Sequence, residues 1–202
     1  MAHRPDTQIG VLGAARAHAC ADEIALMGRV AAEEMAAFES LYRLYHPRLT
    51  RFLEKMTQRP ALVEEILDDT MLVVWRKAHT YNPSAKVSTW IFAIAWRQAL
   101  KALRQIDDAV EFCADKQAGS AGVEPDGEMQ QQELRVRLGQ ALSALSAEHR
   151  AVIELTYYFG YACREIAQIM GCPVDTVKTR MFYARKKLSE LLAAAGIDRG
   201  WP

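Results

Sequence analysis

The chain has 202 residues, which allows one or two domains, and half of the residues are hydrophobic, which is ample for a core. No apolar run approaches the roughly 20 residues that a membrane-spanning helix needs, and the N-terminus resembles no secretory signal, so we expect a cytoplasmic protein. The four cysteines are scattered and form no CxxC pair, so we expect reduced thiols and neither a metal site nor a cofactor.

The 25 basic and 25 acidic residues give a formal net charge of zero, but they are unevenly distributed. Residues 38–106 carry 11 basic and 6 acidic side chains, residues 107–133 carry 1 and 8, and residues 134–202 carry 10 and 6. Because phosphate affinity follows local charge, both basic blocks are candidates for contact with nucleic acid. Alanine and leucine are abundant and strand-like alternation is almost absent, which favours an all-α fold.

Composition divides the chain into two small helical domains and a connector. We expect the domains over residues 22–106 and 134–193, a flexible acidic linker over residues 107–133, and tails at residues 1–21 and 194–202. The N-terminal tail is expected to lack regular structure. The linker is either a solvating tether or a segment whose acidic side chains imitate a nucleic-acid strand against a basic channel.

In the first domain, helices are predicted at residues 39–56, 62–80 and 89–105, and the middle one has an acidic face on a helical wheel. Two large apolar side chains lie within this acidic arc, and the whole set is Glu64, Glu65, Asp68, Asp69, Leu72 and Trp75. Apolar anchors surrounded by charge are typical of a surface that docks on a basic protein partner. Paired carboxylates can also bind Mg²⁺, but no second acidic cluster, phosphate loop or activated nucleophile accompanies them, so we expect neither an enzyme nor a small-molecule substrate.

An irregular loop over residues 82–88, enforced by Asn82-Pro83, precedes the third of these helices. Arg97, Lys101 and Arg104 form one basic stripe on that helix, which can simply be solvated. A polar loop beside a basic stripe also suits a separated nucleic-acid strand, because cations follow phosphates while the loop accepts an unstacked base. The expected contacts to such a strand are Asn82, Ser84, Lys86, Ser88, Arg97 and Lys101.

In the second domain, residues 161–190 contain two short predicted helices joined by a tight turn, with Gly171 suited to the end of the first helix. The second helix has one apolar stripe, formed by Val177, Met181, Ala184 and Leu188. Its opposite side carries rings and polar groups, namely Thr179, Phe182, Tyr183 and Lys186, flanked by Lys178 and Arg185. An ordinary helical hairpin leaves the paired exposed rings unexplained, whereas a helix that enters a DNA major groove accounts for them.

Taken in order, these segments resemble the extracytoplasmic-function sigma factors of bacterial RNA polymerase. The resemblance covers residues 24–106 and 134–192 and rests on the segments AAFESLYRLYHPRLTRFL, VEEILDDTMLVVWRKA, YNPSAKVSTWIFAIA and LSALSAEHRAVIELTYYFGYACREIAQIMGCPVDTVKTRMFYARKKL. It implies a sigma subunit that performs no chemistry, in which the first module docks on the polymerase clamp and melts the −10 element. The second module, a helix-turn-helix, would read the −35 element.

The resemblance also implies roles and partners. The six residues of the acidic helix would bind core polymerase, and residues 82–88 would accept a flipped −10 base. The −35 element would be read by Lys178, Thr179, Arg180, Phe182 and Tyr183, with Lys186 beside them. The implied partners are the clamp and flap of core RNA polymerase, promoter DNA, and an anti-sigma factor that holds the protein inactive, in the cytoplasm or at the inner membrane, until a stress or envelope signal.

Four features depart from the family's pattern. The loop over residues 82–88 is one residue shorter than the common form, and Trp96-Arg97 replaces the usual Arg-Asn pair. Ala162 stands where a Ser or Thr often caps a helix, a loss of about 1 kcal/mol, and Tyr183 stands where an Arg is common. The alternative is a helix-turn-helix regulator that acts without polymerase, which predicts specific duplex binding by the isolated chain.

Overall fold

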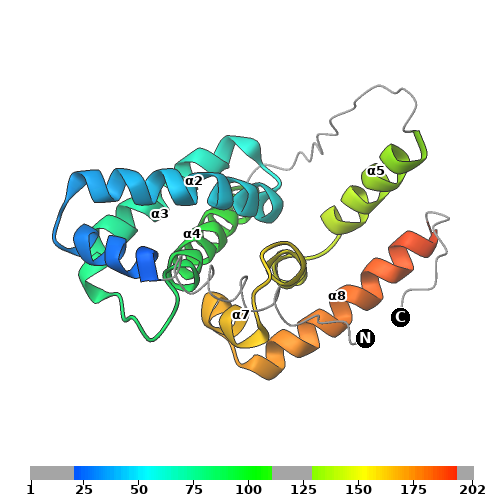
Figure 1. Cartoon of the computed structure of the whole chain (residues 1–202). Coiled ribbons are helices and arrows are strands. Elements are labelled where there is room, and N and C mark those ends of the chain that lie inside the picture. The colour runs from blue at the N-terminus through cyan, green and yellow to red at the C-terminus, as the bar shows by residue number, and fades with distance from the viewer. Residues whose placement is uncertain (1–20, 111–128, 195–202) are drawn as a thin grey trace, which may run out of the picture.

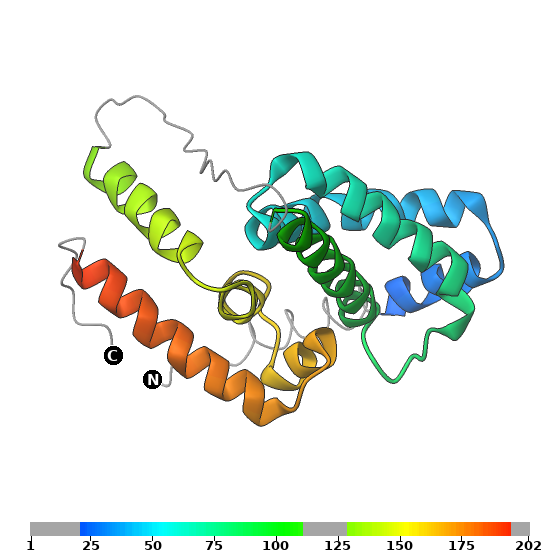
Figure 2. The same ribbon diagram turned by 180° about the vertical axis from the view of Figure 1, so that it is seen from behind.

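The computed structural model describes residues 21–110 and 129–194, and all regular structure within these ranges is helical. A helix over residues 21–31 comes first, and the elements that follow it are α2 (Met35–Thr57), α3 (Pro60–Lys77), the 3-10 turn η1 (Ala78–Thr80) and α4 (Val87–Val110). The second group contains α5 (Met129–Ser143), α6 (Ala147–Ile153), the π-helical turn η2 (Glu154–Tyr158), α7 (Cys163–Met170) and α8 (Val174–Ala194). Figures 1 and 2 show two groups of helices, which confirms the predicted all-α class. We call them the docking module and the helix-turn-helix module.

The docking module is held together by the apolar faces of α2, α3 and α4. The buried positions of α2 recur every three or four residues, as they do at Leu41, Tyr45 and Leu49. All six residues from Ile91 to Trp96 in α4 are buried. A helix segment that is buried all round needs neighbours on every side, and α4 has them in α2, α3 and α7.

The ends of the predicted linker are helical. α4 continues to Val110 and α5 begins at Met129, so each module is longer than its predicted boundary of 106 or 134. The remainder of the linker and the predicted tails, except for residues 21 and 194, lie outside the described residues. The helix over residues 21–31 was not predicted as a separate element.

The helix-turn-helix forms where the sequence predicts it. Gly171 ends α7 with a φ of 64°, a left-handed conformation that glycine adopts without a Cβ penalty. α8 buries Val177, Met181 and Ala184 against the rest of the module, which are three of the four predicted stripe residues. At the start of α7, Ala162 has no capping side chain, and Glu165 instead accepts a hydrogen bond of 2.8 Å from the Ala162 N–H.

Restoring the missing cap is expected to stabilise the protein. Ala162 is exposed and extended, with φ −72° and ψ 154°, so a serine hydroxyl there can accept from an unpaired N–H of the first turn of α7. We expect Ala162→Ser to raise the free energy of unfolding by about 1 kcal/mol, measured by urea titration. Ala162→Val, which cannot cap, is the matched control, and equal gains from both variants would contradict the capping explanation.

The two modules pack directly against each other and share one continuous core, a contact that the sequence does not predict. α7 lies against the start of α4, as Figures 1 and 2 both show, and α6 lies against α2. The Phe92 ring of the docking module lies 5.0 Å from the Phe159 ring and 5.6 Å from the Tyr161 ring of the other module, measured between centroids. These rings bury each other across the boundary, which stabilises the contact between the modules.

Candidate nucleic-acid and protein interfaces

The acidic face predicted on α3 is present and open to solvent. Its four carboxylates belong to the exposed residues Glu64, Glu65, Asp68 and Asp69. They point outward because the opposite face of α3 is buried in the docking module, through residues such as Ile66, Leu67 and Val74. Leu72 lies on the same side and keeps 44% of its surface exposed, which is unusual for a large apolar side chain in a helix that has a core to join.

Two contacts from α2 position the acidic face. The Tyr42 hydroxyl donates a hydrogen bond of 3.3 Å to Asp68 Oδ1, and His46 Nε2 lies 3.7 Å from Glu64 Oε2. Partial burial, and then the Asp68 carboxylate, hold the pKa of the Tyr42 hydroxyl above its ordinary value. Trp75 is half-buried, since its ring packs edge-on against Phe38 at 5.0 Å. The face therefore has a fixed aromatic edge and exposed carboxylates, which suit a cationic protein partner.

The loop after η1 is held in shape by its own polar groups. The Ser84 N–H donates to Asn82 Oδ1 at 2.9 Å, and the Tyr81 hydroxyl donates to the Ala85 carbonyl. Asn82 and Ser84 are exposed, as a strand-binding loop requires. Further along α4, Arg97, Lys101 and Arg104 are also exposed, as their predicted stripe requires.

Ser88 and Lys86 differ from the expectation of a free loop. Ser88 is only 7% exposed, because the first turn of α4 lies beneath α7 of the helix-turn-helix module. The Lys86 Nζ forms an ion pair of 2.7 Å with Glu165 Oε1 on α7. In this arrangement Ser88 cannot contact a base, and Lys86 already has an anionic partner.

The outer face of α8 carries the predicted rings and cations. Phe182 and Tyr183 are 63% and 53% exposed, and their ring centroids lie 5.4 Å apart. The Lys178 Nζ forms an ion pair of 3.0 Å with Asp175 Oδ1, and the Thr179 hydroxyl donates to the Asp175 carbonyl at 2.9 Å. Exposed rings of this size on a core-forming helix indicate a binding surface.

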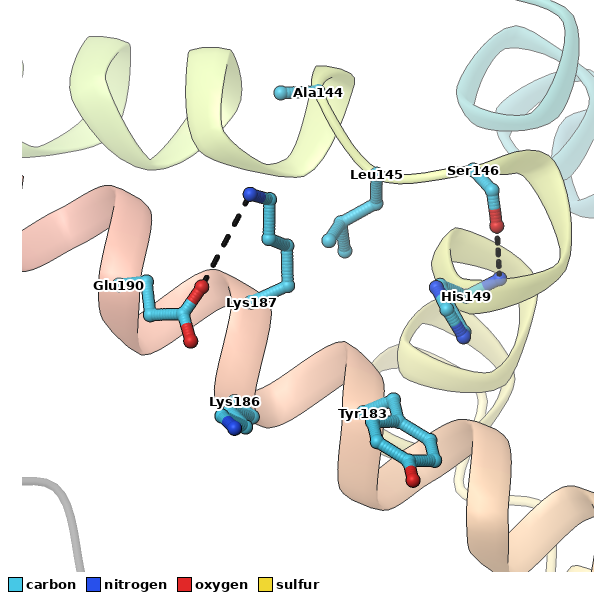
Figure 3. A pocket seen from close by; sticks show the side chains of 8 residues that line it. All are labelled: Ala144, Leu145, Ser146, His149, Tyr183, Lys186, Lys187 and Glu190. Carbon is cyan, nitrogen blue, oxygen red and sulfur yellow. Dashed lines mark hydrogen bonds and ion pairs between the residues drawn. The ribbon is translucent and has the colours of Figure 1, made fainter.

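The remaining predicted residues of α8 lie at the edges of this face. Arg180 is half-buried, and its Nη1 lies 3.7 Å from Cys172 Sγ in the turn, so it does not share the exposure of its neighbours. Tyr183 and Lys186 are among the residues that line an open pocket between α8 and the connection from α5 to α6, together with Leu145 and Ser146 (Figure 3). Phe182, Thr179 and Lys178 do not line that pocket.

Two residues that sequence analysis did not single out have central positions. Arg150 is 6% exposed and donates hydrogen bonds to carbonyls in both modules, while Glu165 both caps α7 and pairs with Lys86. A signal for the first was available, because Arg150 and Glu154 are the only charged residues within the apolar stretch from residue 150 to 155. A signal for the second was the Ala162-x-x-Glu165 spacing, which is half of a capping box.

Residues 21–110 and 129–194 hold no group of three or more His, Cys, Asp or Glu side chains that could bind a metal ion. No helix in the same ranges combines the length and apolarity that crossing a bilayer requires. A helix-turn-helix with exposed rings and cations is typical of a DNA-binding protein, and an acidic face with an exposed leucine is typical of a surface that contacts a protein partner.

Comparison with known proteins identifies the family. The family model described as Sigma-70 region 2 matches residues 41–108, and the one described as Sigma-70, region 4 matches residues 135–188. The ECF RNA polymerase sigma factor RpoE of Cereibacter sphaeroides is 34% identical over 175 residues, which cover 84% of this chain and 94% of that protein. The ECF RNA polymerase sigma factor SigL of Mycobacterium tuberculosis is 29% identical over 177 residues, covering 87% of this chain and all of that protein (100%). The chain belongs to the extracytoplasmic-function sigma factors of the sigma-70 family.

Solved structures have the same fold. The sigma factor RpoE from Bartonella quintana, in complex with the anti-sigma factor NepR, matches with a TM-score of 0.65 and 26% identity, over 80% of this chain and 98% of that one. CnrH, in complex with the cytosolic domain of CnrY, matches with a TM-score of 0.62 and 23% identity, over 85% of this chain and 97% of that one. The second likeness supports the fold alone.

Proposed function

We propose that this protein is an alternative sigma factor that binds core RNA polymerase, directs it to a set of promoters and performs no chemistry itself. The observation that carries the proposal is the presence, in one chain, of an acidic face with exposed Leu72 on α3 and of a ring-and-cation face on α8. The first suits a basic protein surface, and the second suits a DNA major groove. A sigma factor requires both.

Each surface has a proposed role. The acidic face of α3, with Leu72 and Trp75, docks on the polymerase clamp. The loop over residues 82–88 accepts a flipped base of the melted −10 strand, while Arg97 and Lys101 follow its phosphates. The outer face of α8 reads the −35 element: Phe182 makes apolar base contacts, and Lys178 and Lys186 contact phosphates or bases. The helix-turn-helix module also meets the polymerase flap.

An inhibitor is a further part of the proposal. The Bartonella quintana RpoE, which shares this fold at 26% identity, has been crystallised with an anti-sigma factor. We propose that an anti-sigma factor, acting in the cytoplasm or from the inner membrane, covers the docking and DNA-binding faces until a signal releases the protein. Exposed Leu72, Phe182 and Tyr183 are the anchors that such an inhibitor would bury.

Transcription in vitro tests the function. Purified core polymerase and a promoter library are incubated with and without the chain, and transcript starts are sequenced. A sigma factor gives new starts downstream of a shared pair of elements and binds duplex weakly on its own. A helix-turn-helix regulator that acts alone, the alternative function, would instead bind specific duplex tightly without polymerase and would give no new starts.

Substitutions on the outer face of α8 are expected to change promoter choice. Phe182→Ala and Lys178→Ala each remove an exposed contact, and we expect each to lower initiation about tenfold, corresponding to the 1–3 kcal/mol of a single base contact. The loss should shrink when the −35 element is replaced by an unrelated sequence, which is measured by competing promoters in one reaction. Lys187→Ala is the control, since Lys187 is exposed on the same helix but lies near Glu190, with 4.0 Å between Nζ and Oε2. If initiation falls equally whatever the −35 sequence, these residues do not read its bases.

A further inference from the structure

We infer that the free protein closes on itself, and that in the closed state Glu165 of α7 occupies the position of a DNA phosphate on Lys86 of the −10 loop. The inference rests on the proposed sigma function for the meaning of that loop, but the closed state itself rests only on contacts within this chain. The helix-turn-helix module thereby acts as an internal competitor of the melted −10 strand.

The polar contact between Lys86 and Glu165 is the centre of this closure. Their charged atoms lie 2.7 Å apart, with 59% of the Lys86 side chain and 19% of the Glu165 side chain exposed. The Glu165 carboxylate is also fixed by the Ala162 N–H at 2.8 Å, so it is already oriented when Lys86 reaches it. A carboxylate held in this way offers Lys86 what a phosphate offers, which is an anionic oxygen at ion-pair distance.

Aromatic contacts also join the two modules. Phe92 on α4 packs against both Phe159 and Tyr161, and Phe159 also lies 6.2 Å from Phe52 on α2, between ring centroids. Phe52, Phe92 and Tyr161 belong to one continuous buried cluster that spans both modules, and the half-buried Phe159 packs against it. Exposing them by separating the modules would cost the free energy of their burial, so the isolated chain favours the closed state.

Contacts further from the loop reinforce the boundary. The Arg51 guanidinium lies 3.4 Å from the Tyr158 ring centroid, and Gln58 Nε2 donates to the Ser143 carbonyl at 3.0 Å. Arg150 Nη1 donates to the carbonyls of Lys55 at 2.8 Å and Met56 at 3.4 Å. Polar contacts therefore lie at separate points along the boundary, which limits rotation of one module on the other.

Closure affects the proposed surfaces unequally. The carboxylates of α3 and the rings of α8 stay exposed, whereas Ser88 is buried and Lys86 is paired. The closed protein can therefore meet polymerase through α3, and duplex DNA through α8, before it can hold a melted strand on its loop. We infer that the modules separate after docking, when the −10 strand replaces Glu165 at Lys86.

Carbodiimide cross-linking of the full chain tests the closed state. A carboxylate and an amine in contact are joined without a spacer, so residues 86 and 165 should be linked in the free protein and detected by mass spectrometry of peptides. The pair of Lys187 and Glu190, at 4.0 Å within α8 and outside the proposed DNA contacts, is the internal standard for the reaction. We expect the 86–165 link to fall at least about fivefold against this standard when polymerase and promoter DNA are added, since opening removes the contact.

Neutral variants test the ion pair by itself. In Glu165→Gln the side-chain amide oxygen can still accept from the Ala162 N–H but carries no charge, so this variant should raise the acetylation rate of the Lys86 amine about two- to fivefold in the free chain. Asp175→Asn is the matched control: it should raise the reactivity of Lys178 and leave Lys86 unchanged.

Three results would overturn the inference. These are a free chain that forms the 187–190 link but not the 86–165 link, an 86–165 link that is undiminished in an initiating complex, and Lys86 reactivity that is unaffected by Glu165→Gln. A protein that shows the link but supports no transcription would overturn the sigma function and leave the closed state standing.

Discussion

Asp68→Arg together with Asp69→Arg is expected to abolish binding to core polymerase and to reduce initiation at least about 100-fold. The two carboxylates lie side by side on the exposed acidic face of α3, where no buried group of the module depends on them. Reversing both charges places cations against a basic partner, and like charges across an interface cost several kcal/mol, while 1.4 kcal/mol is a factor of ten. Calorimetric titration of core polymerase and run-off transcription measure the two effects.

The same change should leave the fold intact. Glu64 and Asp68 are four residues apart on one helix, as are Glu65 and Asp69, so the reversal replaces two repulsions with two attractions of a few tenths of a kcal/mol each. The reversal removes the hydrogen bond of 3.3 Å that the Tyr42 hydroxyl donates to Asp68. We therefore expect an unchanged or slightly higher melting temperature.

A control variant separates position from charge. Glu33→Arg with Glu54→Arg changes the net charge by the same amount at exposed positions outside α3 and should initiate normally. If the Asp68 and Asp69 reversal initiates as well as this control, α3 is not the polymerase-docking surface.

The surfaces of α3 and α8 could be predicted because each depends on a single helix. A period of 3.6 residues decides which side chains share a face, and the buried Val74 and Val177 show which side points inward. The Gly171 turn could be predicted for the same reason, since a left-handed C-cap is a local property of the chain. The position of the acidic face therefore needed no knowledge of the tertiary structure.

The packing of the two modules could not be predicted in this way. It joins Phe92 to Phe159 and Lys86 to Glu165, pairs separated by more than 60 residues and by the linker, and no periodicity connects them. The burial of Ser88 follows from that packing alone, which is why a loop that the sequence predicts to be open is partly covered in the structure.

Replacement of Arg150 is expected to have the largest effect on the free energy of unfolding. It donates five hydrogen bonds: two to Lys55 and Met56 near the end of α2, and three to Leu142, Ser143 and Leu145 at the end of α5. The carbonyl ends of two helices thus converge on one cation, which favours positive charge there. Burial lowers the pKa of the Arg150 guanidinium, while the nearby carboxylate of Glu154 opposes that shift.

Arg150→Met is expected to lower the free energy of unfolding by about 3–5 kcal/mol, because the methionine fills space but leaves buried carbonyls without donors. We also expect the two modules to unfold at different urea concentrations in this variant. Among the described residues, the tryptophans all lie in the docking module, so with Trp201→Phe in every variant, fluorescence follows that module while circular dichroism follows all helices. In urea the two signals should coincide for the parent and diverge for Arg150→Met, with the helix-turn-helix module unfolding first.

The matched control is Arg43→Met. The Arg43 side chain is 81% exposed and its contact with Glu39, at 3.5 Å, is that of a solvated ion pair, so its loss should change the free energy of unfolding by less than about 0.5 kcal/mol. Arg150→Lys keeps the charge but cannot reach five carbonyls from one ammonium, so it should recover only part of the loss. Equal effects of Arg150→Met and Arg43→Met, or coincident signals in the former, would mean that Arg150 does not couple the modules, and the closed state would then depend on the aromatic cluster and Glu165.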